Sequence, residues 1–356
     1  MILENLGWNA YFADQYEILK AEDTFPARVS VVEKESFKIT SERGVQIATV
    51  SGNYRHTAIT RSEFPAVGDW VVVRPNPLED EQQTILSILP RKTCFSRSAV
   101  TGKDRLGNAV MSEQVLAANL DYVFIVMGLD SDFNLRRAER YVVAAKSSDA
   151  EPVLILSKSD LSNETETQVT DLGETCPGVP IHVISSFEPS KLEVLDQYLT
   201  SGKTVVLIGS SGVGKSTLIN QLLGSERAKT GEARVSDGKG KHTTTWRELF
   251  VLPGGAVLID NPGIREIGVW SPSVEDTFAD IEELANSCRY TKCTHTKEAG
   301  CAVLAALKSG KLEKKRYQNY QVLAEEAGLI RTQQNNKIRS KIQEKQRKQG
   351  NAKTRR

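Results

Sequence analysis

The stretch GSSGVGKST carries the most specific pattern for chemistry in this sequence. It follows the β-branched run TVVLI and precedes the apolar run LINQLL, which is the strand-then-helix context of a phosphate-binding loop. In such a loop backbone N–H groups surround the β-phosphate, Lys215 spans the β- and γ-phosphates, and the Ser216 hydroxyl ligates Mg²⁺. We therefore expect a nucleotide site formed by Gly209, Ser210, Ser211, Gly212, Val213, Gly214, Lys215, Ser216 and Thr217.

A second phosphate-sensing element is expected where Asp260-Asn261-Pro262-Gly263 closes the apolar run AVLIDN. In nucleotide hydrolases an Asp here reaches Mg²⁺ through water, and the N–H of the following Gly contacts the γ-phosphate. D-x-P-G alone is a common turn. Its distance after the phosphate loop favours the phosphate-sensing role for Asp260, Pro262 and Gly263.

The nucleobase is expected to be read by Ser157-Lys158-Ser159-Asp160, which follows the run PVLIL and resembles the N/T-K-x-D element of GTPases. The Asp160 carboxylate can accept hydrogen bonds from N1–H and the 2-amino group of guanine, a donor pair that adenine lacks. An unpaired acceptor can reject the wrong base by on the order of 10⁴. Ser157 departs from the usual Asn or Thr, which leaves the tightness of guanine selection open.

Two serines, Ser185 and Ser186, follow the run IHVI and resemble the element whose backbone contacts the guanine O6. In ordinary GTPases both base-reading elements follow the phosphate loop, whereas here they precede it. We therefore expect a circularly permuted GTPase domain, in which the sheet is kept and the chain ends move to a loop near the switches. The second switch then continues directly into a C-terminal domain.

A metal site is expected at Cys288-x₄-Cys293-x-His295-x₅-Cys301. Three thiolates and one imidazole make a closed tetrahedral set for one structural Zn²⁺, with no open position for catalysis. Free thiols of a reducing compartment are the alternative. The other two of the five cysteines, Cys94 and Cys176, are expected to be packing residues.

Hydrophobic patterning assigns these motifs to three regions. Short β-rich runs over 25–90 predict an all-β, OB-like barrel. From about residue 119, strands alternate with helices predicted over 135–148, 164–173 and 190–200, which indicates a parallel α/β sheet. Further helices are predicted over 275–286 and 311–327. The expected multidomain chain comprises an OB-like RNA-binding barrel with an N-terminal extension (1–95), a permuted P-loop GTPase domain (96–273) and a helical zinc-binding domain with a basic tail (274–356).

Charge is distributed unevenly, although the formal net charge is +1. Residues 331–356 contain ten Lys or Arg and one acid, so the rest of the chain is acidic. A basic tail indicates a polyanionic partner, and a solvated tail that aids solubility is the alternative. No run approaches the roughly 20 apolar residues of a membrane span, and the N-terminus lacks signal-peptide features. We expect a cytoplasmic monomer that does not bind membranes.

The combination of permuted GTPase elements, a preceding barrel and a following Cys-Cys-His-Cys knuckle resembles the ribosome-small-subunit-dependent GTPase A family, RsgA. The matching segments are FSRSA, FNLRRAERYVVAA, GSSGVGKSTLIN, KGKHTTT and the knuckle. The resemblance implies that the chain docks on the small ribosomal subunit and its rRNA late in assembly, binds GTP and GDP, and hydrolyses GTP under stimulation by the subunit.

Catalysis needs a residue that orients the attacking water. Ras-like enzymes place a Gln after D-x-x-G, but Ile264 holds that position here and cannot do so. The family resemblance assigns this part to His242, and an exposed histidine without a catalytic role is the alternative. One threonine of Thr243, Thr244 and Thr245 is expected to ligate Mg²⁺ in the GTP state, with Thr244 favoured, alongside Ser216 and Asp260.

Two rival functions remain open at this point. One is an RNA-binding module whose slow nucleotide site is only regulatory. The other is a P-loop ATPase or small-molecule kinase, which Asp160 argues against.

Overall fold

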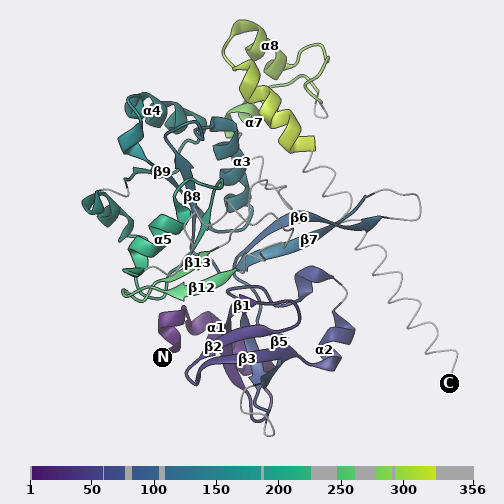
Figure 1. The fold of residues 1–356 in the computed structure, drawn as a ribbon. Coiled ribbons are helices and arrows are strands. Elements are labelled where there is room, and N and C mark those ends of the chain that lie inside the picture. The colour runs from purple at the N-terminus through teal and green to yellow at the C-terminus, as the bar shows by residue number, and fades with distance from the viewer. Residues whose placement is uncertain are drawn as a thin grey trace, which may run out of the picture. The chain divides into compact units, whose positions relative to one another are not determined.

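The computed structural model describes residues 2–58, 60–76, 82–103, 109–185, 188–225, 247–260, 278–290 and 293–325 (Figure 1). The chain divides into two compact units, Met1–Ile267 and Gly268–Arg356. The first unit contains the barrel and a mostly parallel sheet, and the second contains the cysteine cluster.

The predicted barrel is confirmed as five strands, β1 (Phe25–Val32), β2 (Phe37–Ser41), β3 (Gly44–Val50), β4 (Trp70–Arg74) and β5 (Gln82–Ile88). β1 pairs antiparallel with β2 and β4, β2 with β3, and β4 with β5, while the parallel pairing of β3 with β5 closes the ring. Alternating residues of these strands point inward and form an apolar core that includes Ala27, Val29, Ile39, Val71 and Ile85. A short helix, α2 (Gly52–Thr57), follows β3.

An N-terminal segment covers the other face of β4. It consists of a 3₁₀ turn (Leu3–Leu6) and helix α1 (Ala10–Leu19), neither of which the sequence patterning predicted. Trp8 meets Trp70 edge to face with ring centroids 4.6 Å apart, and Phe12 packs in the same cluster. Both faces of β4 are therefore buried.

A long antiparallel hairpin connects the barrel to the next sheet. Its strands are β6 (Cys94–Lys103) and β7 (Ala109–Ala118), and it forms a separate two-stranded sheet (Figure 1). The sequence patterning did not identify it.

The mostly parallel sheet runs in the order β10-β9-β8-β11-β13-β12. All of its pairings are parallel except that of β12 with β13, and β12 also pairs with β1, which joins this sheet to the barrel. Every residue of the central strand β11 is buried. The strands are β8 (Tyr122–Gly128), β9 (Glu151–Ser157), β10 (Ile181–Val183), β11 (Thr204–Ile208), β12 (Glu248–Val251) and β13 (Val257–Asp260).

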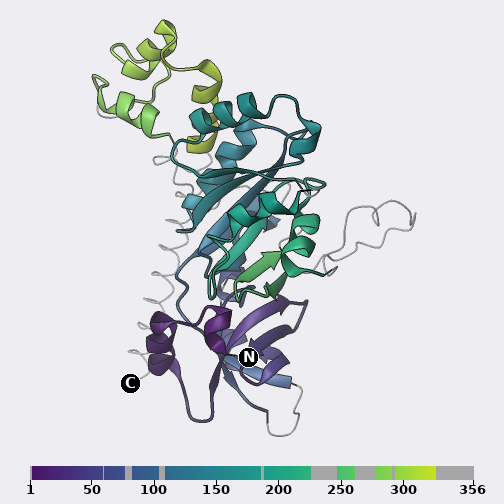
Figure 2. The ribbon, with the colours of Figure 1, turned by 90° about the vertical axis from the view of Figure 1, so that its left-hand side faces the viewer.

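Three α-helices accompany this sheet, α3 (Leu135–Lys146), α4 (Thr165–Thr175) and α5 (Lys215–Leu223), and Figure 2 shows them packed beside the strands. The helix predicted over 190–200 is instead a 3₁₀ helix over Pro189–Leu195, followed by turns. Strand β9 precedes β11 in the chain, and β8 lies between these two strands in the sheet. This arrangement agrees with a permuted order.

The second unit is helical. It contains α7 (Ala279–Asn286), α8 (Ala302–Ser309) and helical residues over 314–325. The first and last agree with predicted helices, whereas α8 was not predicted. Arg316 forms two hydrogen bonds of 2.8 Å with Asp280, and Phe278, Ile281 and Val303 are fully buried.

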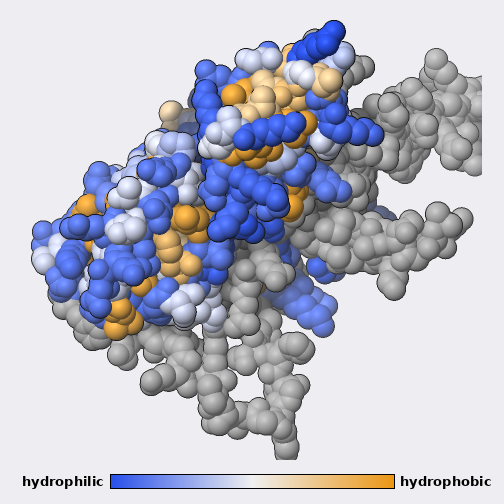
Figure 3. All heavy atoms as spheres, turned by 90° about the horizontal axis from the view of Figure 1, so that it is seen from above, coloured by the Kyte–Doolittle hydropathy of each residue, from blue (hydrophilic) through white to orange (hydrophobic). Residues whose placement is uncertain are grey.

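Hydrophilic side chains dominate the described surface on the face in Figure 3, with apolar side chains in small separate groups. Among the described residues, no helix has the length and apolar character of a membrane span.

Candidate nucleotide-binding site and metal centre

The phosphate loop connects the buried strand β11 to helix α5, which begins at Lys215. Gly209 has φ of 146°, and a Cβ atom there would lie 2.2 Å from the Val126 carbonyl oxygen, so only glycine fits beside β8. Gly214 (φ 93°) is left-handed and starts the helix. The Lys215 ammonium donates hydrogen bonds to the carbonyl oxygens of Gly209 (2.9 Å) and Ser210, which places it within the loop.

The two expected base-reading elements meet at the ends of β9 and β10. The Ser185 hydroxyl is fully buried and donates to Asp160 Oδ1 at 2.8 Å. This bond restrains one carboxylate oxygen of Asp160. Two segments 25 residues apart in the chain therefore form one candidate base site.

Ser157 connects this base site to the phosphate loop. Its buried hydroxyl lies 2.7 Å from the carbonyl oxygen of Val213 in the loop and 3.3 Å from that of Met127 in β8. A hydroxyl has a single proton, so the shorter bond to Val213 is the stronger one. The residue that departs from the usual base-reading pattern thus contacts the phosphate loop.

Asp130 is a site residue that sequence reasoning missed. Its carboxylate accepts a hydrogen bond from the Lys158 ammonium, with Nζ and Oδ2 2.7 Å apart. This bond is the main reason that the pKa of Asp130 is held below its ordinary value. The only signal in the sequence was its position at the end of the apolar run YVFIVMG, where ligands gather in parallel sheets.

Asp260 ends β13 and lies in register with Leu207 of β11, so it is placed at the same edge of the sheet as the phosphate loop. Ser216 and Thr217 lie in the first turn of α5. The remaining predicted site residues, Ser186, His242, Thr243, Thr244, Pro262 and Gly263, fall outside the described residues.

The predicted metal ligands converge in the second unit. One ligand atom from each of Cys288, Cys293, His295 and Cys301 lies within 4.8 Å of all the others. The His295 Nδ1 atom is 3.6 Å from Cys288 Sγ and 3.4 Å from Cys301 Sγ. This donor set and its compactness fit a tetrahedral zinc ion.

Neighbouring groups hold the ligand loop in shape. The backbone N–H groups of Ala302 and Leu304, at the start of α8, point at the sulfurs of Cys288 (3.3 Å) and Cys301 (3.4 Å). Such donors stabilise thiolate charge. The Tyr317 hydroxyl donates to the His295 carbonyl oxygen.

The Glu298 carboxylate, which lies between His295 and Cys301 in the chain, organises the same loop. It accepts backbone N–H bonds from Thr294 and Thr296, both 3.0 Å long. The hydrogen bond from the Thr294 hydroxyl is the main reason that the pKa of Glu298 is held well below its ordinary value, and the backbone N–H groups of Lys297 and Thr294 lower it further.

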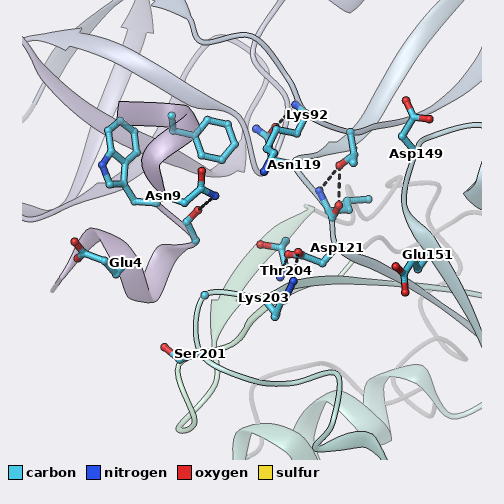
Figure 4. Close-up of a pocket in the computed structure, with 16 residues that line it drawn as sticks. Glu4, Asn9, Lys92, Asn119, Asp121, Asp149, Glu151, Ser201, Lys203 and Thr204 are labelled. Atoms are coloured by element: carbon cyan, nitrogen blue, oxygen red, sulfur yellow. Dashed lines mark hydrogen bonds and ion pairs between the residues drawn. The ribbon is translucent and has the colours of Figure 1, made fainter. Parts of the chain in front are cut away.

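A cavity of about 550 Å³ lies at the opposite edge of the sheet (Figure 4). Its lining includes Glu151, Lys203 and Thr204, which stand at the beginnings of β9 and β11, and Trp8 and Phe12 of the N-terminal segment. Lys203 and Thr204 N–H both donate to the Asp121 carboxylate at 2.8 Å. In parallel sheets ligands bind beyond the carboxyl ends of strands, so this cavity belongs to the joint with the barrel and not to the nucleotide site.

Comparison with known proteins agrees with this geometry. A family model described as RsgA GTPase matches residues 88–270, more than half of the chain. A model described as ABC transporter matches residues 192–349, a stretch that contains the phosphate loop common to both classes.

Several relatives are similar over most of their length. A protein of Opitutus terrae named small ribosomal subunit biogenesis GTPase RsgA is 43% identical over 336 residues, which cover 92% of this chain and 90% of that protein. A protein of the same name from Syntrophotalea carbinolica is 41% identical over 323 residues, covering 90% and 88%.

Solved structures share the fold. YjeQ from Thermotoga maritima aligns with a TM-score of 0.58 at 24% identity, over 86% of this chain and 99% of that one. YloQ, described as a circularly permuted GTPase, aligns with a TM-score of 0.56 at 21% identity, over 85% and 95%. From the family match and the near full-length relatives, the chain belongs to the RsgA family of GTPases.

Proposed function

We propose that this chain hydrolyses GTP and acts in the biogenesis of the small ribosomal subunit. The observation that carries the proposal is the similarity of about nine tenths of the chain to proteins named for that function. The meeting of Asp160 and Ser185 near the loop that holds Lys215 supports a guanine nucleotide as ligand.

In this proposal the protein acts late in assembly as a cytoplasmic monomer and checkpoint factor. The GTP-bound form binds the immature subunit, and hydrolysis stimulated by that subunit releases the protein as the GDP form. The barrel, the zinc-binding unit and the basic tail over 331–356 contact rRNA. Neutralisation of RNA phosphates supplies much of the affinity, so binding weakens steeply as salt rises. Specificity comes from the shape of the rRNA, since A-form grooves offer little direct readout.

The residues have distinct roles in the proposed reaction. Lys215 stabilises charge on the β- and γ-phosphates during transfer to water. Ser216, Thr244 and Asp260 would hold Mg²⁺, which when bound neutralises the phosphate oxygens. Because Ile264 cannot orient water, intrinsic turnover is slow, and His242 orients the attacking water on the ribosomal subunit.

The test is GTP hydrolysis by the full chain with and without purified small subunits. We expect strong stimulation by the subunit and, for His242→Ala, normal GTP binding with most of the stimulation lost. Equal stimulated rates for wild type and His242→Ala would remove the histidine from the mechanism. Absence of stimulation in the wild type would instead favour an RNA-binding module with a slow, regulatory nucleotide site.

A further inference from the structure

The pairing of Asp130 with Lys158 connects two ends of neighbouring strands. Lys158 follows β9 and belongs to the expected base-reading element, whereas Asp130 follows β8. The Nζ and Oδ2 atoms are 2.7 Å apart, and the two side chains are 31% and 27% exposed. A pair this exposed contributes little to folding stability, about 0 to 1 kcal/mol. A role in binding therefore explains its geometry better than a role in stability.

The turn that carries Asp130 is built to present its carboxylate. The Asp132 N–H donates to Asp130 Oδ1 at 3.0 Å, and the Phe133 N–H donates to the Asp130 carbonyl oxygen at 3.0 Å. A Cβ atom on Gly128 would lie 2.6 Å from Asp130 Oδ1, so the absence of a side chain there makes room for the carboxylate. Asp132 is itself held by an ion pair of 2.8 Å with Arg137 of α3.

The turn that carries Asp130 lies at the end of a strand between the two halves of the candidate site. Strand β8 lies between β9, which leads to Asp160, and β11, which leads to the phosphate loop. All three strands are parallel, so Asp130 stands at the carboxyl edge between the base half and the phosphate half of the site.

Lys158 also has a constrained backbone. Its φ of 59° and ψ of 40° lie in the left-handed region, which is uncommon for a residue with a long side chain. This conformation fixes the direction in which the side chain leaves the chain, and Asp130 then fixes its far end. The four-carbon stem between these two points is thereby confined, although a lysine stem is ordinarily flexible.

We propose that Asp130 is a positioning residue for nucleoside binding: it anchors the Lys158 ammonium so that the methylene stem of Lys158 forms one wall of the guanine slot. The inference rests on the proposed function, because it takes guanine nucleotide as the ligand. Anchoring removes the entropic cost of ordering the stem when the base enters. The affinities for GTP and GDP are raised equally, because the Asp130–Lys158 pair acts on the base and not on the γ-phosphate.

The experiment measures dissociation constants for GTP and GDP with full-length wild type, Asp130→Asn, Lys158→Met and the double variant. Asp130→Asn keeps the size of the side chain but removes the charge, and Lys158→Met keeps the stem but removes the ammonium. We expect each single variant to bind both nucleotides about five- to tenfold more weakly. In GTP hydrolysis the KM for GTP is expected to rise, while kcat stays close to that of the wild type. The double variant is expected to be no weaker than the weaker single one.

Asp149→Asn is the matched control, because Asp149 is an exposed aspartate in a left-handed turn at the opposite edge of the sheet. Its affinities are expected to equal those of the wild type. Additive losses in the double variant, or a lower thermal midpoint that accounts for the Asp130→Asn loss, would show that Asp130 does not act through Lys158. If Asp130→Asn binds GTP and GDP with wild-type affinity, the inference is overturned and the proposed function is not. A wild-type chain that binds no guanine nucleotide would overturn the proposed function and this inference with it.

Discussion

At the scale of single residues, the Ser157 hydroxyl connects the proposed base-reading element to the proposed phosphate loop. Its side chain is 5% exposed and lies 2.7 Å from the Val213 carbonyl oxygen of the phosphate loop. The hydrogen bond ties the loop to the segment that carries Asp160. Ser185 acts in a similar way, because its single hydroxyl donates to the Asp160 carboxylate and restrains it.

Ser157→Ala tests this connection. The change leaves the buried Val213 carbonyl without its donor, which costs about 1 to 3 kcal/mol of folding stability. We expect a lower denaturation midpoint and weaker binding of GTP and GDP alike, measured by chemical denaturation and by nucleotide titration. Ser157→Thr keeps the hydroxyl and is expected to stay close to wild type. Equal behaviour of the Ala and Thr variants would contradict the account.

Functional motifs made of residues close together in the chain could be predicted from the sequence, whereas contacts between residues far apart in the chain could not. The phosphate loop and the four ligands from Cys288 to Cys301 are local patterns, so spacing alone identified them. Asp130 meets Lys158 across 28 residues, and a lone aspartate after a strand carries no pattern that names its partner.

At the scale of elements, the parallel strands could be predicted because each is a short, mostly apolar run bounded by turn residues. Helix α1 was missed because its burial depends on Trp70, which comes more than 50 residues later. Helix α8 was missed because it starts directly after Cys301, the last metal ligand, whose side chain caps it by accepting a hydrogen bond from the Leu304 N–H. The long hairpin of β6 and β7 lacks the alternation that marks a strand with one buried face.

The helices of the second unit are short, and this predicts a dependence on metal. Helices α7 and α8 have eight residues each, and helices shorter than about 12 residues are marginal in water without tertiary support. Native mass spectrometry is expected to show one zinc per chain. Cys301→Ser is expected to lose the metal and the thermal stability of this unit, whereas Cys94→Ser keeps both. A metal-free wild type of normal stability would refute the zinc site.

At the scale of the whole first unit, Arg28 joins the barrel to the phosphate-loop strand. The side chain is 1% exposed and donates to the carbonyl oxygens of Gly68 and Asn119, both at 3.1 Å, and to the Thr204 hydroxyl at 2.9 Å. A further bond reaches the Leu6 carbonyl oxygen. Burial lowers the pKa of Arg28 to about 10, so the guanidinium remains charged at neutral pH. Partners up to 176 residues apart explain why the sequence did not reveal this joint.

Arg28→Met is expected to destabilise the first unit by on the order of 3 kcal/mol, because it removes the side-chain donor of the Leu6 and Asn119 carbonyl oxygens in a buried joint. The free energy of unfolding measured in urea checks this. Arg55→Met, at an exposed arginine of α2, is the control and is expected to shift it by less than about 0.5 kcal/mol. Equal shifts for the two variants would contradict a structural role for Arg28.

The central claim is that segments in permuted order, β9, β10 and the loop after β11, form one guanine-nucleotide site. Its most direct test is the nucleotide preference of Asp160→Asn, measured as dissociation constants for GTP and xanthosine triphosphate. An amide can donate to the 2-oxo group of xanthine, whereas it cannot accept both guanine donors. We predict that Asp160→Asn loses affinity for GTP and gains affinity for xanthosine triphosphate. An unchanged preference for GTP would contradict the account.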